Sequence, residues 1–508
     1  MVAETWKQYG LPRYRTLPDQ TRWSVGTATA LVVAVLLFFV DHALGYAVVT
    51  ITALWWLRRL PPLPWRLVGQ VVLVAIFLVA GVTSLALALA IAFGVFWVPR
   101  RYRTRVLPVV AIALAILYPF YQAKMFTIPV FGVWPDVATG VVMLVFIMMA
   151  VGLNIVVGYA GLLDLGYVAF YAMGAYTAAW FSSLQFAKQN VHFGAVGITP
   201  TLPGIHITVW ALLALAGVVT AVTGIVIGLP TLRLRGDYLA IVTLGFGEIL
   251  PQIARNGDNL FGTGFNLTNG PNGITPLDSP GFGNGISNAT GGFLPSNYLQ
   301  CCSANVLGHQ VQSTDVFFWT AILLLLITVF CSLRLQYSRL GRAWIAIRED
   351  ETAAAAMGVP LMRTKTWAYA TGAFFGGVAG AYYASFKSAT FPGDFFFNIS
   401  VFILCMVILG GMGNVWGVIV GAGFLAYLDR EGLANTGAWI NANVHVGSWH
   451  PNIDVPLYAS GIYGLIILVV MLFRPEGLIP SRRVAAEMHE GVHDEPLYDA
   501  QHAGAEAT

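Results

Sequence analysis

Residues 338–358 read SRLGRAWIAIREDETAAAAMG, a charged stretch between two long apolar segments of the chain. The Arg-Glu-Asp-Glu run at 348–351 places carboxylates in the first turn of a predicted helix, where negative charge is stabilising, and the alanines that follow favour helix. Gly358 and Pro360 end this helix. A helix of about ten residues is only about 15 Å long, which is too short to cross a bilayer. The stretch therefore lies on one face of a membrane or projects from it.

Basic residues flank this stretch and indicate which face it occupies. They are Arg334, Arg339, Arg342, Arg363 and Lys365. Because cytoplasmic loops of membrane proteins carry an excess of basic residues, we predict a cytoplasmic loop over residues 334–365. A soluble partner could bind there, although an ordinary connecting loop would carry the same charges.

The composition indicates the class of protein. Of the 508 residues, 57% are hydrophobic and 10% are charged, and the mean hydropathy is +0.71. A water-soluble globule of this composition would expose too much apolar surface, so we predict an all-α, polytopic membrane protein in contact with a lipid bilayer. The net charge of +3 is small and the basic residues lie mainly beside apolar runs. They indicate orientation, and no nucleic acid is expected as a partner.

The sequence shows no pattern of catalytic or metal-binding residues. It lacks the GxxxxGK[ST] loop that cradles nucleotide phosphates. Its four cysteines have no metal-site or disulfide spacing, because Cys331 and Cys405 lie in apolar segments and Cys301 and Cys302 are adjacent. We predict a protein that is not an enzyme, with no cofactor and no metal. The adjacent cysteines could form a disulfide with another subunit or remain unpaired.

The chain is predicted to start and end in the cytoplasm. Residues 1–24 are polar and basic, and residues 25–135 form an accessory bundle of about four or five passes whose purpose the sequence does not indicate. Residues 67–98 are too long for one pass of about 30 Å, so two short passes turning near Gly81 are favoured over one tilted helix. Residues 481–508 form a polar cytoplasmic tail.

Residues 136–480 form the predicted core of about nine passes. These passes lie near residues 136–157, 165–184, 207–229, 236–250, 316–333 and 366–383, twice within 396–428, and at 456–473. The double crossing within 396–428 keeps the basic residues after the last pass in the cytoplasm. The polar loop at 255–314 then lies outside, in the periplasm, with an insertion near 277–312.

Two glycine-rich strings interrupt this core. One is VGLNIVVGYAGLLDLGYVAFYAMGAY at 151–176, which contains Asn154 and Asp164, and the other is GGMGN at 410–414. A glycine-rich break within a membrane is tolerated only where it is buried in protein or faces a cavity, and transporters place broken helices around their substrate path. Candidate pathway residues in these strings are Asn154, Asp164, Gly411, Gly413 and Asn414. Ordinary close packing of helices is the alternative explanation.

A further candidate pathway residue is Glu248 in GDYLAIVTLGFGEIL at 236–250. A carboxylate in an apolar run is costly unless it is paired or faces water. Glu248 could also lie near the outer interface of the membrane. Asp237 is expected to cap the helix that follows it.

Several of these strings resemble the branched-chain amino acid ABC transporter permeases, and specifically their LivM-type subunit. The longest is GRAWIAIREDETAAAAMGV at 341–359, and the others are the strings at 151–176 and 236–250, NGPNGI at 269–274, LGGMGNVWG at 409–417 and RPEGLIP at 474–480. The resemblance implies the permease subunit of an ATP-driven, binding-protein-dependent importer of branched-chain, hydrophobic amino acids. Such a subunit lies in the bacterial inner membrane and moves its substrate by alternating access.

The resemblance also implies partners and a site of coupling. The expected partners are a second homologous permease, two cytoplasmic ABC ATPase subunits and a periplasmic substrate-binding protein. The acid-Ala-Ala and Gly pattern is similar to the coupling loop of ABC importer permeases. It assigns coupling to the ATPases to Arg348, Glu349, Asp350, Glu351, Ala354 and Gly358.

Other functions remain open at the level of sequence. Permeases for urea and short-chain amides look similar over the same strings. An ion-coupled secondary transporter or channel is a further alternative, in which Asp164 and Glu248 would bind the ion or proton.

Overall fold

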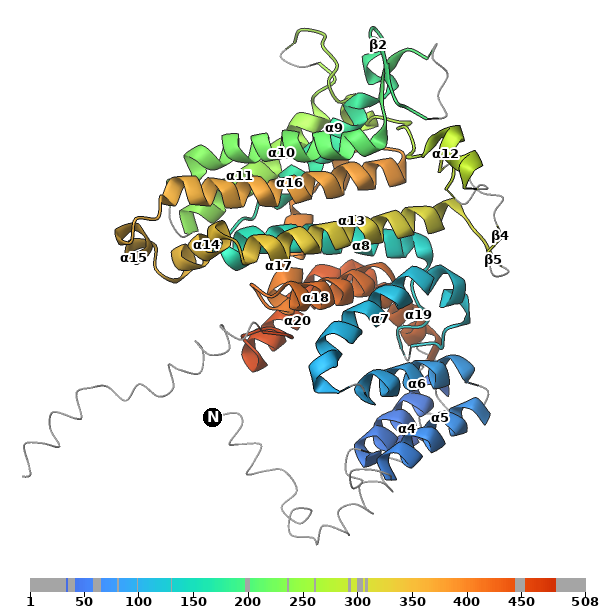
Figure 1. The fold of residues 1–508 in the computed structure, drawn as a ribbon. Helices are drawn as coiled ribbons and strands as arrows, with labels where there is room; N and C mark the ends of the chain where they lie inside the picture. The colour runs from blue at the N-terminus through green and yellow to red at the C-terminus, as the bar shows by residue number, and fades with distance from the viewer. Residues whose placement is uncertain are drawn as a thin grey trace, which may run out of the picture. The chain divides into compact units, whose positions relative to one another are not determined.

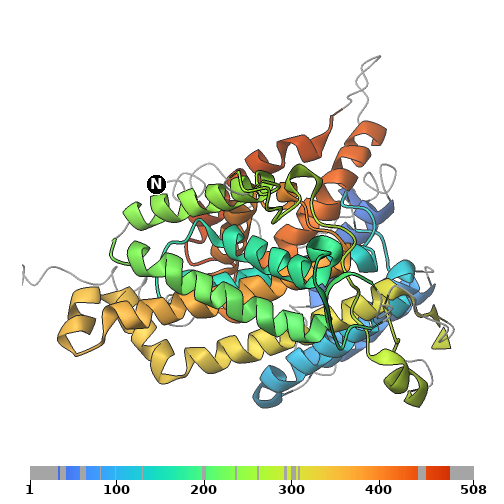
Figure 2. The same ribbon diagram turned by 90° about the horizontal axis from the view of Figure 1, so that it is seen from above.

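The computed structural model describes most of the chain, and the fold is drawn in Figures 1 and 2. The described residues are 33–34, 42–57, 65–79, 82–97, 99–128, 130–196, 202–234, 237–259, 262–290, 294–298, 305–306, 309–443 and 453–480. They divide into two compact units, which we describe separately. Unit 1 lies within Met1–Asp136 and Arg430–Leu457, and unit 2 lies within Val137–Asp429 and Tyr458–Thr508.

Unit 1 is built of helices, of which α7 is the longest. They are α4 (His42–Leu57), α5 (Trp65–Val79), α6 (Thr83–Trp97), α7 (Arg100–Tyr121), the 3-10 turn η1 (Gln122–Lys124) and α19 (Leu433–Asn443). The predicted division of residues 67–98 is confirmed, because α5 and α6 are separate helices. Leu73 and Phe77 of α5 pack with Ala86 and Leu89 of α6, and the indole of Trp97 donates a hydrogen bond to Gln70. The sequence did not predict α19.

The large helices of unit 2 agree with the predicted passes. They are α8 (Val137–Leu153), α9 (Tyr167–Phe181), α10 (Val209–Thr231), α11 (Asp237–Arg255), α13 (Ser313–Gln336), α16 (Leu361–Lys387), α17 (Phe397–Gly410), α18 (Val415–Tyr427) and α20 (Ala459–Phe473). Between α17 and α18 lie residues 411–414, so the predicted glycine break is present. The side chain of Asp237 lies outside the described part, although α11 does begin at that residue.

Short elements occupy the connections of unit 2. Three of them are π- or 3-10 turns next to long helices: η2 (Asn154–Tyr159), η3 (Leu184–Phe186) and η5 (Pro392–Asp394). Two short helices are η4 (Gly270–Asn272) and α12 (Gly283–Ala289). A three-stranded sheet has the strand order β1 (Ser182–Ser183), β3 (Gly204–Ile207), β2 (Asn190–Phe193), and the strands β4 (Asn305–Val306) and β5 (His309–Gln310) pair with each other. The π-helical turn η6 (Leu428–Gly432) and the 3-10 turn η7 (Val455–Tyr458) span the two boundaries of the stretch of unit 1 that interrupts unit 2. These strands were not predicted. Cys301 and Cys302 lie outside the described residues.

The core of unit 2 depends on close contact between helix backbones. A Cβ atom on Gly174 of α9 would collide with the backbone of Gly377 in α16, and one on Gly380 would collide with the backbone of Tyr171. Small residues allow two helices to approach this closely. Both views show α9, α10 and α16 side by side (Figures 1 and 2). Close packing therefore explains part of the glycine-rich string at 151–176.

The helical, membrane-spanning character predicted from composition is confirmed. In the described residues, six helical segments are long and apolar enough to cross a membrane: Val106–Lys124, Val137–Tyr159, Val209–Thr231, Ser313–Gln336, Pro392–Gly410 and Val455–Phe473. Shorter apolar helices accompany them. The predicted number of passes and the sides of the two termini stay predictions.

Candidate functional site

The charged stretch at 338–358 forms two helices. They are α14 (Arg339–Glu349) and α15 (Glu351–Ala356), and they lie at one end of α13 and α16, with α12 at the opposite end of unit 2 (Figure 1). Asp350 separates them in an extended conformation, and its Oδ1 accepts hydrogen bonds from the amides of Thr352 at 2.7 Å and Ala353 at 3.0 Å. These bonds lower the pKa of Asp350. The predicted first turn at 348–351 was wrong, because the cap at Asp350 starts the helix at Glu351.

One face of this helical pair packs against the protein itself. Trp344 is fully buried and donates from its indole to the carbonyl of Thr364 at 2.8 Å, and Ala354 is also buried. The carboxylate of Glu351 contacts the buried ammonium of Lys365 in α16 at 2.8 Å. Glu351 and Ala354 therefore hold α15 on α16.

The other face of α15 is exposed and nearly uncharged. It carries Thr352, the alanines at 353, 355 and 356, and Met357, whose side chain is 85% exposed. Gly358 has a φ of +84° and ends α15 in the left-handed region. Of the residues predicted for coupling, Glu349, Asp350 and Gly358 lie on the exposed side.

Arg348 joins α14 to the end of η2. Its guanidinium donates a hydrogen bond to the carbonyl of Gly158, where the helix dipole favours positive charge. The contact requires glycine nearby. A Cβ on Gly161, which has a φ of +68°, would lie 2.7 Å from Arg348 Cγ, and one on Gly413 would lie 3.3 Å from its Nη1.

Asn154 joins η2 to the second glycine break. It is fully buried at the first residue of η2, and its Oδ1 accepts a hydrogen bond from the amide of Gly413 at 2.9 Å. A π-helical turn widens the helix and often marks a functional position. Arg348, Asn154 and Gly413, predicted from three separate strings, therefore meet at one place, which we name the coupling junction.

Gly411 and Asn414 support the turn between α17 and α18. Gly411 has a φ of +109°, and a Cβ there would lie 2.8 Å from the carbonyl of Ile479. The side chain of Asn414 accepts from the amide of Trp416 at 3.2 Å and donates to the Ile479 carbonyl at 2.9 Å. These contacts hold residues 474–480 against the break.

Asp164 is buried before α9. Its Oδ1 accepts from the amide of Gly166 at 2.8 Å, while its Oδ2 has no hydrogen-bond partner among the described residues. Its side chain is 1% exposed. Because this carboxyl group is buried, an opening of the surrounding helices would be needed for a ligand to reach it.

Glu248 belongs to a different place, on the uncovered face of α11. It lines an open groove of about 660 Å³ together with Ile249, Gln252, Ile253, Asn256, Asn259 and Gly262. Sequence reasoning missed Gln252 and Asn256. The signal was the spacing of four residues between Glu248, Gln252 and Asn256, which places them on one helix face.

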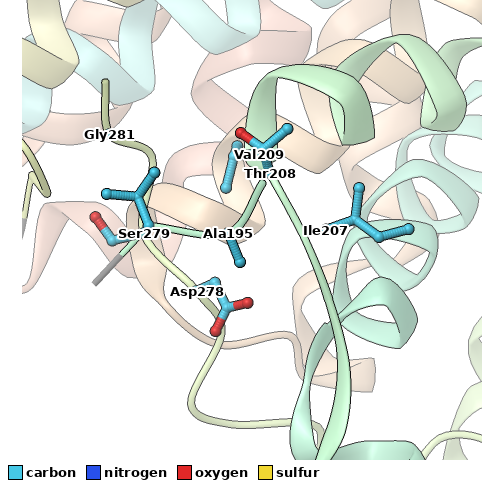
Figure 3. Close-up of a pocket in the computed structure, with 8 residues that line it drawn as sticks. Ala195, Ile207, Thr208, Val209, Asp278, Ser279 and Gly281 are labelled. Carbon is cyan, nitrogen blue, oxygen red and sulfur yellow. The ribbon is translucent and has the colours of Figure 1, made fainter. Parts of the chain in front are cut away.

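Another pair of polar residues lies in the loops at the α12 end of unit 2. His206 Nδ1 and Asp278 Oδ2 are 2.8 Å apart. Burial raises the pKa of Asp278, and the hydrogen bond with His206 offsets part of this effect. Figure 3 shows the small pocket beside Asp278, lined also by Ile207 and Ser279, and a water-sized sphere finds no room in it. The pair therefore ties β3 to the loop rather than forming an open site.

Clusters of three or more His, Cys, Asp or Glu side chains suited to a metal are absent from the described residues. At the coupling junction, the side chains of Arg348 and Asn154 form hydrogen bonds with the backbone of Gly158 and Gly413, respectively. These two bonds connect η2 with α14 and with the turn at residues 411–414.

Comparison with a family of known proteins and with individual members of it identifies relatives of this chain. Residues 137–471 match the family described as "Branched-chain amino acid transport system / permease component". The high-affinity branched-chain amino acid transport system permease protein LivM of Salmonella typhimurium is 36% identical over 362 residues, which cover 70% of this chain and 72% of that protein. The protein of the same name from Escherichia coli is 34% identical over 389 residues, 75% of this chain and 76% of the relative.

A more distant relative is archaeal. The probable branched-chain amino acid transport permease protein LivM of Methanocaldococcus jannaschii is 25% identical over 358 residues, 67% of this chain and 91% of that protein. No solved structure shows significant similarity to this chain. The matched family covers more than half of the chain, and two relatives exceed 30% identity over most of their length. The chain therefore belongs to the family of branched-chain amino acid transport system permease components.

Proposed function

We propose that this chain is the transmembrane permease subunit of an ATP-driven, binding-protein-dependent importer of branched-chain amino acids. The relatives supply the substrate class through their names. The observation that best supports an externally driven mechanism is the hydrogen bond from Arg348, in the exposed helical pair, to Gly158, at the end of a membrane helix. Through this hydrogen bond, a displacement of α14 would act directly on η2, the turn that follows α8.

The topology completes this proposal. Residues 334–365 and both termini lie in the cytoplasm, and the loop at 255–314 lies in the periplasm, with the chain in the inner membrane of a bacterial cell. About nine passes form the core at 136–480, and residues 25–135 add an accessory bundle of four or five. The opposite ends of unit 2 occupied by α15 and α12 are consistent with this arrangement (Figure 1).

The partners follow from the same proposal. Two cytoplasmic ATPase subunits supply the hydrolysis for which this sequence has no phosphate-binding loop, and a second homologous permease and a periplasmic binding protein complete the transporter. The exposed side of α15 is the surface for one ATPase. Met357 and the exposed alanines present a small apolar contact, with Asp350 and Glu349 beside it.

The mechanism is alternating access. ATP binding closes the ATPases and moves α14 and α15. Arg348 carries this movement to η2, and Asn154 carries it to Gly413, so that the glycine-interrupted helices rearrange together. Gly411 and Asn414 allow the turn between α17 and α18 to act as a hinge, and Asp164 lies where α9 begins.

Uptake by a strain that lacks its own branched-chain amino acid importer tests this proposal. The chain is expressed with its neighbouring genes, and uptake of leucine is measured with vanadate, with a protonophore and with excess urea or acetamide. We expect vanadate to abolish uptake and the amides not to compete. Uptake that survives vanadate and collapses with the protonophore would support an ion-coupled transporter, and competition by urea would support an amide permease.

A further inference from the structure

The groove on α11 has a regular chemical pattern. Glu248, Gln252 and Asn256 follow one another at intervals of four residues, and Ile249 and Ile253 form a parallel row one position further on. A spacing of four residues places side chains one above another along a helix. The groove is therefore polar on one side and aliphatic on the other.

All five side chains are exposed. Ile249 is 51% exposed and Ile253 is 49% exposed. The side chains of Glu248, Gln252 and Asn256 form no hydrogen bond with any of the described residues. Pro251 and Ala254 lie on the opposite side of α11 and are buried, so the helix is fixed with this face outward.

A carboxylate and two amides on an uncovered helix of a membrane protein need water or a ligand. Polar side chains that face lipid are costly, and such residues in membrane segments mark substrate and ion paths. Glu248 lies seven residues before the end of α11 at Arg255, or about 10 Å along the helix. The groove thus extends from the loop end of α11 along the exposed face of this helix.

We infer that this groove is the outward-facing binding site for the substrate, an amino acid with an aliphatic side chain in its zwitterionic form. The inference rests on the proposed function. Glu248 accepts charge-assisted hydrogen bonds from the substrate ammonium. The amide groups of Gln252 and Asn256 donate to its carboxylate. Ile249 and Ile253 contact the aliphatic side chain.

The dimensions agree with this assignment. Glu248 and Gln252 are one turn apart, about 6 Å along the helix, so two groups separated by one turn can bind the two charged ends of one small ligand. The volume of about 660 Å³ lies within the range of ligand sites. A neutral ligand such as urea has no ammonium for Glu248 to bind, so the carboxylate selects amino acids over amides.

Accessibility of introduced cysteines tests the groove in the assembled transporter. Gln252→Cys and Ile253→Cys are treated with a membrane-impermeant maleimide, with and without millimolar leucine or urea. We expect labelling from outside, protection by leucine, no protection by urea, and loss of protection when Glu248→Gln is added. The control Ile286→Cys, on exposed α12, is labelled equally with and without leucine, and the parent chain gives the background from its own cysteines.

Transport provides the second measurement. Glu248→Gln lowers the initial rate of leucine uptake at saturating binding protein about tenfold or more, whereas Asp258→Asn, just beyond α11 and outside the groove, stays within about twofold of the parent. Unlabelled cysteines, labelling that leucine does not change, or full transport by Glu248→Gln would each overturn the inference. A parent transporter that moves no branched-chain amino acid would instead overturn the proposed function.

Discussion

The guanidinium of Arg348 donates a hydrogen bond to the main-chain carbonyl of Gly158, a residue 190 positions earlier in the chain. Gly158 lies in the π-helical turn at the end of the candidate membrane span Val137–Tyr159, and Arg348 lies in the last turn of α14, outside the candidate spans. The side chain of Asn154 then links the same turn to Gly413. One arginine thus connects the surface proposed for the ATPase to both glycine breaks.

Arg348→Ala is expected to uncouple ATP hydrolysis from transport. The variant removes the link to Gly158 but leaves the exposed face of α15 intact, so the ATPases still bind and hydrolyse. We expect leucine uptake per ATP hydrolysed to fall about tenfold. Both rates are measured in proteoliposomes with the purified complex.

Arg342→Ala is the matched control for this experiment. Arg342 is on the same helix as Arg348, but it donates a hydrogen bond to the carbonyl of Tyr337, only five residues earlier in the chain. Its uptake per ATP is expected to equal that of the parent. Normal coupling in Arg348→Ala, or loss of the ATPases from the complex, would contradict the role that we give to Arg348.

Gly161→Ala is expected to destabilise the coupling junction. The left-handed backbone at φ +68° costs an alanine about 1–2 kcal/mol, and its Cβ would also push against Arg348. The midpoint of thermal unfolding of the purified complex should fall. Gly245→Ala is the control, because Gly245 lies within α11 and no atom comes within 4 Å of the added Cβ. An unchanged midpoint in Gly161→Ala would show that the loop adapts freely.

Glu351→Gln is expected to destabilise the chain more than Lys365→Met. The glutamine leaves the buried ammonium of Lys365 without its carboxylate, at a cost of about 1–3 kcal/mol. Methionine removes the buried charge itself and leaves the carboxylate of Glu351, which is 30% exposed and can be hydrated. In the double variant both members of the pair are neutral. Thermal unfolding of the two variants and of the double variant measures this difference.

The double variant also separates two roles of Glu351. If Glu351 acts only by holding α15 on α16, restoring stability with Lys365→Met should restore binding of the ATPases. ATPase binding that stays weak in a stable double variant would show that Glu351 contacts the ATPase directly.

Asp164→Asn is expected to fold at least as well as the parent. Its amide oxygen keeps the hydrogen bond from Gly166, and the substitution removes a buried carboxyl group whose Oδ2 has no partner among the described residues. Asp164→Ala loses the hydrogen bond and should unfold at a lower temperature. Transport that falls in a stable Asp164→Asn would place the carboxylate in the transport cycle, and normal transport would restrict it to the fold.

Much of the fold follows from local sequence. The apolar runs, the break at 411–414, the short helix after Asp350 and the division between α5 and α6 depend on neighbouring residues, so their pattern predicts them. The start of α15 was missed because an acidic run can continue one helix or cap the next, and only the turn at Asp350 decides between them. The strands and α19 were missed because their sequences have no strong periodicity.

Among the candidate site residues, the sequence by itself determined which were unusual. It identified Asn154, Gly413 and Glu248 as polar, glycine or charged residues in apolar surroundings, and Arg348 as part of a charged stretch, and these are local properties. Tertiary packing alone decided how they combine. The hydrogen bond between Arg348 and Gly158, which are 190 positions apart, depends on which helices lie together. The exposure of one face of α11 depends on the same packing. The same packing turned Glu351 toward Lys365 and left Met357 exposed, since each face of a short helix is assigned by its neighbours and not by its own composition.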